Sequence, residues 1–280
     1  MIVRGSDLLS DAALALNFSS VIHQTDYLIH TRDNSWTQHH PHALHVRWSD
    51  DDNERLVTQC YPQFTVLYTR MLFLPVQRTD LVRVLYLHQF GGLYVDIDYE
   101  AHTDVVAAVH ASSRHSISVV RSPALMNEVM QNSLMHANAS GLAFFLRCAE
   151  SILEIMTFIH TGCNFSNSCA VLKLFHHRVS RTAMHVILTQ YITGPAVLDK
   201  TYVKYKGSDD VGLLGSEFFH GPIAYHHQAN TWVQVARAAL PILSMVLVVI
   251  ALCNTACLVC VARKLTRHHG ADAVIEIKTD

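Results

Sequence analysis

The chain has 280 residues and a formal net charge of −2, with 21 Lys and Arg against 23 Asp and Glu. This balance, and the lack of a basic block before the apolar segment near the C-terminus, argue against nucleic-acid binding. The length suits one or two domains, and the hydrophobic fraction of 50% is high for a soluble chain. We therefore expect one folded domain and a membrane anchor.

The first part of the chain predicts two strands and one helix. Residues 1–19 lack the continuous apolar core of a signal peptide, which leaves open whether a further segment precedes them. Val21–Thr25 is a short strand candidate, and Ala43–Trp48 alternates as a second strand. Ser49–Asp52 can then cap a helix over Asn53–Cys60.

Two further helices are expected before the most informative stretch of the sequence. Phe64–Leu74 is expected to be helical and to stop at Pro75. In Thr79–Phe90 the apolar residues recur at helical spacing, and Gly91-Gly92 is the expected C-terminal stop. Leu93–Ile97 then alternates as a buried strand.

Two carboxylates leave the end of this strand on the same side. Because side chains alternate along a strand, Tyr94, Asp96 and Asp98 are expected to face away from the apolar residues between them. Neighbouring buried carboxylates repel each other unless a cation compensates them. Mg²⁺ or Mn²⁺ suits such oxygen ligands and completes its shell with substrate phosphates, so the pattern indicates a nucleotide diphosphate.

Asp80 and Arg83 lie three apart on the preceding helix, so they share a face and could look toward the same strand end. There Arg83 could hold a phosphate or a sugar hydroxyl. An isolated Asp96-x-Asp98 triplet would most simply be a polar strand terminus. Acids and an arginine also suit metal-dependent phosphoryl transfer, but the chain has no P-loop.

The rest of the chain predicts further elements and an anchor. Ser116–Val120 is a strand candidate, Gly141–Ile159 a long helix, and Lys200–Ser216 a loop that could close over a substrate. Leu240–Val261 contains no charge and can span a bilayer as a helix, because about 20 residues rising about 1.5 Å each cover its core. We expect the membrane helix over 238–262.

Asp80 and Arg83 followed by Gly91-Gly92-Leu-Tyr-Val-Asp96-Ile-Asp98 resembles the glycosyltransferases with a DXD sugar-binding motif, the group containing the initiating α-1,6-mannosyltransferase and the inositol phosphoceramide mannosyltransferases. The resemblance implies an α/β, GT-A type, Rossmann-like single domain with a mixed sheet over 20–235. The membrane helix and a short cytosolic tail over 263–280 would follow this domain.

The resemblance also implies roles for individual residues. Thr193-Gly194-Pro195 matches the T-G-P block of the family, although alone it would be a simple turn, and His226 takes the position of a family histidine. His226 either completes a Mn²⁺ shell or is a surface histidine near the membrane. The implied catalytic residues are Asp96, Asp98 and Arg83; the implied donor-binding residues are Asp80, Arg83, Asp96, His23, Gln24, Thr193 and Gly194; the implied metal ligands are Asp98 and His226.

The implied function is a metal-dependent, retaining transfer of a hexose from a nucleotide sugar. Mannose from GDP-mannose is the expected donor group, and a membrane lipid such as inositol phosphoceramide is the expected acceptor. The alternatives are a protein or N-glycan mannosyltransferase, or an inactive membrane-anchored binding protein on the same fold. The partners are then a nucleotide sugar, a lipid or glycan acceptor and a membrane, with no nucleic acid.

The expected location is the Golgi, with a luminal catalytic domain and a single membrane span. Arg263, Lys264 and Arg267 follow the predicted span, and the positive-inside bias places them in the cytosol. Glycosylation sequons begin at Asn17 and Asn138, and a third begins at position 164, all before the span. The lack of a recognisable signal peptide favours the opposite orientation, a tail-anchored protein with a cytosolic domain.

Overall fold

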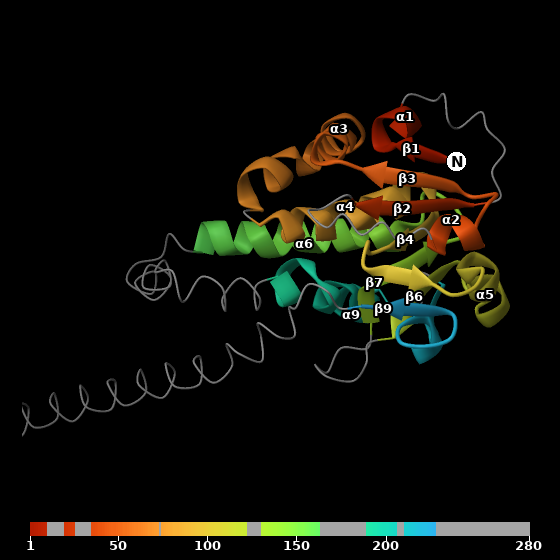
Figure 1. The fold of residues 1–280 in the computed structure, drawn as a ribbon. Helices are drawn as coiled ribbons and strands as arrows, with labels where there is room; N and C mark the ends of the chain where they lie inside the picture. Colours follow the sequence, from red (N-terminus) through yellow and green to blue (C-terminus); the bar gives the residue numbers. More distant parts are fainter. Residues whose placement is uncertain are drawn as a thin grey trace, which may run out of the picture.

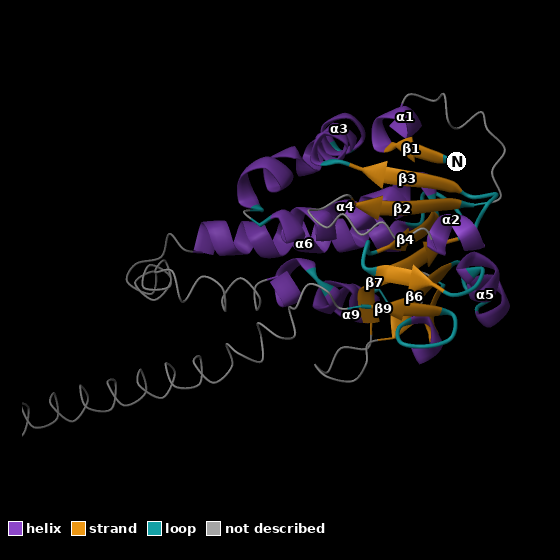
Figure 2. Ribbon diagram, viewed as in Figure 1, coloured by secondary structure: helices purple, strands orange, loops and turns teal. Residues whose placement is uncertain are grey.

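The structure, a computed structural model, describes residues 1–9, 20–25, 35–72, 74–121, 130–162, 189–205 and 210–227. These residues form a mixed α/β fold in which helices cover a central sheet (Figures 1 and 2). This agrees with the expected α/β class and mixed sheet; the GT-A type stays a prediction. The predicted membrane helix over 238–262 and the tail over 263–280 lie outside the described residues, as do the predicted sequons at Asn17 and position 164.

The described strands form one large and one small sheet. The order of the large sheet is β1 (Ile2–Arg4), β3 (Leu44–Trp48), β2 (Val21–Thr25), β4 (Gly92–Val95), β7 (Met130–Ala137), β6 (Ile117–Arg121) and β8 (Val211–Leu214). Within this large sheet, the pairings of β7 with β4 and with β6 are antiparallel and the other pairings are parallel. In the small sheet β5 (Tyr99–Ala101) pairs antiparallel with β9 (Ala224–His226).

Helices pack on both faces of the large sheet and bury two apolar clusters. The described helices are α1 (Gly5–Leu9), α2 (Ser35–His39), α3 (Asp50–Cys60), α4 (Pro75–Phe90), α5 (Val105–Ser112), α6 (Ala143–Gly162) and α9 (Pro195–Lys204). Figure 1 shows α6 running along the sheet beside α4. Tyr94 belongs to the cluster under α4, whereas Leu93 and Val95 belong to the other, so the predicted alternation along β4 is confirmed.

The two glycines after α4 set the position of β4. As predicted, the helix ends at Phe90, and Gly91 and Gly92 have φ values of 67° and 85°, which side-chain-bearing residues rarely adopt. A Cβ atom at Gly92 would also collide with the carbonyl oxygen of Val21 on β2. Glycine is therefore needed at position 92 for β4 to start directly beside β2. Because the two strands are parallel, their carboxyl ends lie at the same edge of the sheet.

The cap of α3 is also as predicted. The Ser49 side chain accepts a hydrogen bond from the Asp52 amide, and the Asp52 side chain accepts one from the Ser49 amide. The helix starts at Asp50, three residues earlier than predicted, because the acids of the capping segment themselves form its first turn.

Phe64–Leu74 is helical as predicted, as far as Met71, but Pro75 begins the next helix and does not stop this one. That segment contains the end of a 3₁₀ turn, Pro62–Phe64, and a π-helical turn, Leu67–Met71. Pro75 is the first residue of α4, where its missing N–H has no helical partner to lose and its fixed φ suits the helix. The helix that carries the site is thus one turn longer than the apolar spacing predicted.

In the second half of the chain one prediction needs correction and one strand was missed. Lys200–Ser216 is not one loop, because α9 continues to Lys204 and Val211–Leu214 pairs with β6. Strand β7 was not predicted at all, although it connects β4 to β6. Among the helices of the described ranges, none combines the length and hydrophobicity needed to cross a membrane.

Candidate active site

Arg83 of α4 bridges the two acids that the sequence placed near it. Its Nη2 lies 3.1 Å from Oδ1 of Asp80, and its Nη1 lies 3.1 Å from Oδ1 of Asp96. The predicted common face of Asp80 and Arg83 is confirmed, and this face meets the end of β4. All three side chains are therefore part of one charged network below the sheet edge.

The rest of the Arg83 side chain is fixed by contacts within the protein. Nη1 also donates to the carbonyl oxygen of Asn132 at 2.8 Å, and Nε donates to the carbonyl oxygen of Thr79 at 3.3 Å. The guanidinium carbon lies 4.8 Å from the centre of the Tyr94 ring, a cation–π contact. Arg83 is 5% exposed, so in this structure it holds the two acids in place.

Asp80 is buried among donors that come from distant parts of the chain. Asn132 Nδ2 donates to its Oδ1 at 2.8 Å, and Thr193 Oγ1 donates to its Oδ2 at 2.8 Å. Burial raises the pKa of Asp80 to about 6, although the charge of Arg83 opposes this shift. Thr193 thus reaches the predicted site, and Gly194 caps the start of α9 directly after it.

The D-x-D motif forms a turn, because β4 ends at Val95 and does not continue through Ile97 as predicted. The Asp96 amide donates to the carbonyl oxygen of Ser133 on β7, and the Tyr99 amide then donates to the carbonyl oxygen of Asp96 at 3.1 Å. The Asp96 side chain is 25% exposed and accepts a hydrogen bond from the Tyr94 hydroxyl at 2.7 Å. Burial raises the pKa of Asp96, and the nearby Arg83 opposes the shift.

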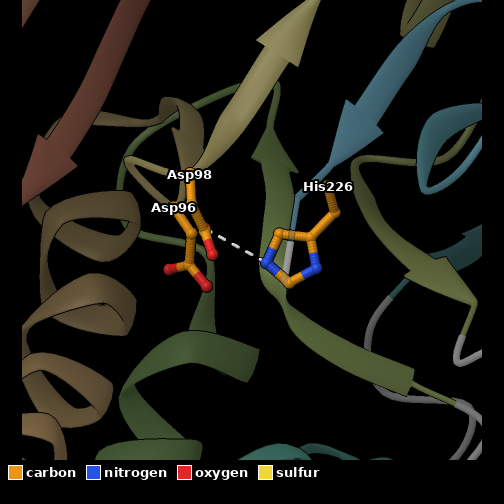
Figure 3. A group of neighbouring side chains, drawn as sticks. All are labelled: Asp96, Asp98 and His226. Carbon is orange, nitrogen blue, oxygen red and sulfur yellow. Dashed lines mark hydrogen bonds and ion pairs between the residues drawn. The ribbon is translucent and has the colours of Figure 1, made fainter. Parts of the chain in front are cut away.

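His226 completes a group of three side chains at this turn. Figure 3 shows the imidazole of His226 pointing toward the carboxylates of Asp96 and Asp98, with Nε2 3.1 Å from Oδ1 of Asp98. Pairing of β5 with β9 places His226 opposite Tyr99, directly after the motif. One ligand atom from each of the three residues lies within 4.8 Å of those of the other two.

This group has the chemistry of a divalent-cation site. Asp96 and Asp98 offer hard oxygen ligands, and a cation would relieve the repulsion between them. The imidazole nitrogen of His226 suits Mn²⁺ better than Mg²⁺, which prefers an all-oxygen shell. Among the described residues this is the group of His, Cys, Asp and Glu side chains that converges closely enough to hold a metal ion.

His23 and Gln24 lie in β2 and are almost completely inaccessible, with 0% and 3% of their surface exposed. His23 Nε2 contacts the carbonyl oxygen of Gly91 at 3.0 Å, and Trp48 Nε1 donates to His23 Nδ1 at 3.2 Å. Burial lowers the pKa of His23 to about 4, so the ring is neutral near pH 7. These are the contacts of a packing residue, and donor binding by either side chain stays a prediction.

Sequence reasoning did not find the roles of Asn132 and Ser133 in the site. Both lie on β7, where Asn132 contacts Asp80 and Arg83, and the carbonyl oxygen of Ser133 accepts a hydrogen bond from the Asp96 amide. The stretch Met130–Ala137 mixes polar and apolar residues without the alternation of a half-buried strand, and both faces of β7 are largely buried. Asn132 and Ser133 are buried, at 6% and 4% exposed, and it is the fold that reveals this burial.

Comparison with known proteins gives a family match for the central part of the chain. The model of the glycosyltransferase sugar-binding region containing the DXD motif matches residues 29–114, which include Asp80, Arg83, Asp96 and Asp98. The resemblance seen in the sequence is thereby confirmed over this stretch. Thr193 and His226 lie outside the matched residues.

Several fungal proteins are similar to parts of the chain. Mannosyl phosphorylinositol ceramide synthase CSH1 of Saccharomyces cerevisiae is 28% identical over 142 residues, 47% of this chain and 34% of the relative. Mannosyl phosphorylinositol ceramide synthase SUR1 of the same yeast is 26% identical over 115 residues, 40% of this chain and 27% of the relative. Inositol phosphoceramide mannosyltransferase 3 of Schizosaccharomyces pombe is 28% identical over 71 residues, 25% of this chain and 20% of the relative.

Among solved structures, the PaToxG glycosyltransferase aligns with 72% of this chain and 76% of its own, at 12% identity and a TM-score of 0.40. The alignments with CSH1, SUR1 and the fission-yeast enzyme span 34%, 27% and 20% of their lengths. The family match and these relatives support an enzyme, a glycosyltransferase.

Proposed function

We propose that this chain carries a metal-dependent, retaining glycosyltransferase domain of the GT-A type. It transfers mannose from GDP-mannose to a membrane lipid such as inositol phosphoceramide. The observation that carries the proposal is the junction of two clusters at one sheet edge: Arg83 braces Asp80 and Asp96, and Asp96 also belongs to the group with Asp98 and His226. The family match covers the four residues from α4 and the motif.

Asp96 contacts the charged network on one side and the other two proposed metal ligands on the other. Its Oδ1 is held by Arg83 and by the Tyr94 hydroxyl, which fixes the direction of the carboxylate toward the edge of the sheet. Asp98 and His226 face this carboxylate from the turn and from β9 (Figure 3). The ligands are therefore positioned before any substrate arrives, which is what electrostatic catalysis requires.

Asp96, Asp98 and His226 would hold a divalent cation, Mn²⁺ in preference to Mg²⁺. When bound, such an ion supplies a Lewis acid for the diphosphate leaving group of a nucleotide sugar. Arg83 adds positive charge beside the same site and opposes the rise that burial causes in the pKa of Asp96. Asp96, whose side chain is 25% exposed, is the candidate for hydrogen bonds to the hydroxyls of the ribose or of the transferred sugar, whereas the buried Asp80 would act through Arg83.

The donor and acceptor are proposed from the names of the similar fungal proteins, which are inositol phosphoceramide mannosyltransferases and mannosyl phosphorylinositol ceramide synthases. A lipid acceptor also agrees with the predicted membrane helix at 238–262, which would keep the catalytic domain close to the bilayer. We extend the proposal to a Golgi membrane protein with a luminal catalytic domain.

The experiment is a donor screen with product analysis. The full chain is incubated with Mn²⁺, inositol phosphoceramide in vesicles, and a panel of GDP- and UDP-sugars, and the products are identified by mass spectrometry. We expect a mannosylated lipid from GDP-mannose. Release of free mannose without transfer to the lipid would contradict the proposed acceptor.

A second arm uses intact cells, where lipid and protein products can be compared directly. Extracts from expressing and knockout cells are expected to differ in mannosylated sphingolipid. A difference confined to protein glycans would support the N-glycan or protein alternative. No binding and no turnover of any nucleotide sugar would support an inactive binding protein.

A further inference from the structure

Tyr99 lies directly after the D-x-D motif and stacks on the imidazole of His226. The ring centres are 4.5 Å apart, and the ring planes differ by 24°. Phe219 contacts the same imidazole edge-on, with ring centres 4.9 Å apart and an angle of 62°. The side chain of His226 is thus confined on its face by Tyr99 and at its edge by Phe219.

Tyr99 is itself held at three points. Its amide donates to the carbonyl oxygen of Asp96, and its own carbonyl oxygen accepts the indole N–H of Trp36 at 2.8 Å. Its hydroxyl lies 3.1 Å from the Ser133 hydroxyl on β7. The residue is 1% exposed, so the ring has little room to change position. One rigid residue therefore joins the carboxylate turn to the histidine strand.

The two nitrogens of His226 differ in a way that makes this stacking important. Nε2 faces Asp98, while Nδ1 is buried and has no hydrogen-bond partner among the described residues. A metal-binding histidine is ordinarily oriented by a hydrogen bond to its second ring nitrogen. Because the described residues supply no such bond, and rotation about the last side-chain torsion of histidine is soft, the ring plane depends on other contacts.

We propose that Tyr99 is a positioning residue that orients the His226 imidazole toward Asp96 and Asp98 by aromatic stacking, in place of a hydrogen bond to Nδ1. The inference rests on the proposed function, since it assigns Tyr99 to the same metal site. It predicts that the ring of Tyr99 determines cation affinity, whereas its hydroxyl contributes only through Ser133.

The test measures Mn²⁺ binding to the full chain without any donor, from the electron paramagnetic resonance signal of free Mn²⁺. The variants are Tyr99→Phe, Tyr99→Leu and His226→Ala, together with the double variant that combines Tyr99→Leu with His226→Ala. Phe218→Leu is the matched control, because Phe218 is equally buried in the same apolar cluster. Circular dichroism checks the folding of each variant, and Tyr99→Met replaces Tyr99→Leu if the latter is unfolded.

We expect Tyr99→Phe and Phe218→Leu to keep the parent affinity within about two-fold. Tyr99→Leu should weaken Mn²⁺ binding by between about two-fold and ten-fold, the range that one aromatic contact carries. In the His226→Ala background the same substitution should have no further effect, because the residue that Tyr99 orients has been removed.

Each alternative outcome identifies what is wrong. If His226→Ala binds Mn²⁺ as the parent does, the proposed metal role of His226 fails. If His226→Ala weakens binding but neither Tyr99→Leu nor Tyr99→Met does, the metal site stands and the inference about Tyr99 is overturned. An equal loss from Tyr99→Leu with and without His226 would also overturn it, because Tyr99 would then act through another group.

Discussion

Arg83→Lys should damage both the stability and the activity of this protein, although it preserves the charge. The guanidinium reaches Asp80 through Nη2, and Asp96 and the Asn132 carbonyl oxygen through Nη1. The single ammonium group of lysine cannot occupy the positions of two separated nitrogens. The variant therefore keeps one acid contact at most in good geometry and loses its hold on the other.

The size of the effect follows from these contacts. A hydrogen bond to a charged group contributes about 1.5–3 kcal/mol, so loss of one acid contact should lower the free energy of unfolding by about 2–3 kcal/mol. Release of Asp96 would move a carboxylate of the proposed cation site, and a misplacement of about 1 Å can cost about 100-fold in rate. We expect a loss of that order in sugar transfer.

Urea denaturation and GDP-mannose turnover measure the two effects. Arg78→Lys is the matched control, because Arg78 is a half-buried arginine of the same helix whose Nε donates to the Leu72 carbonyl oxygen, outside the acid network. The control should differ little from the parent in rate. If Arg83→Lys matches the parent in stability, rate and donor affinity, the bridging role of the guanidinium is wrong.

Three further predictions concern the surroundings of the network. The pKa of Asp80 rises from 3.8 to about 6 on folding, so its stabilising contribution is complete below pH 3.8 and is lost as pH rises through 6. Relative to Asp80→Asn, the free energy of unfolding of the parent should therefore fall by up to about 3 kcal/mol between pH 4 and 7. A rise in this free energy over the same range, measured by urea titration, would contradict the prediction. Gly92→Ala should lower Tm far more than Gly141→Ala, because both have positive φ but only at Gly92 would a Cβ atom collide with backbone, that of Val21. Thr193→Val should cost about 1–2 kcal/mol in urea denaturation, since it removes a hydrogen bond to buried Asp80; an unchanged midpoint would mean that this bond contributes nothing.

The parts of the site that depend on local patterns were predictable. Apolar spacing placed the end of α4 at Phe90, and two glycines marked the turn into β4. The same helical spacing put Asp80 and Arg83 on one face, and the structure joins them at 3.1 Å. These features involve neighbours within a few residues, for which periodicity and backbone conformation are sufficient guides.

The parts that depend on distant pairing were not predictable from periodicity. Asn132 reaches Asp80 only because β7 inserts antiparallel between β4 and β6, and no local pattern marks that insertion. His226 meets Asp98 across 128 residues of sequence through the pairing of β5 with β9. Its candidate role came from the resemblance to a family motif, and the aromatic contact with Tyr99 had no signal in the sequence.

The most direct measurement of the central claim is Mn²⁺-dependent mannose transfer from GDP-mannose by Asp98→Asn. The substitution removes one carboxylate charge from the proposed cation site while nearly preserving the shape of the side chain. Glu154→Gln is the control, because it removes one charge from an exposed ion pair with Lys204 on the surface. We expect the parent and Glu154→Gln to be active with Mn²⁺ and inactive with EDTA, and Asp98→Asn to lose at least about 100-fold in rate. Retention of near-parent, Mn²⁺-dependent transfer by Asp98→Asn would contradict the account.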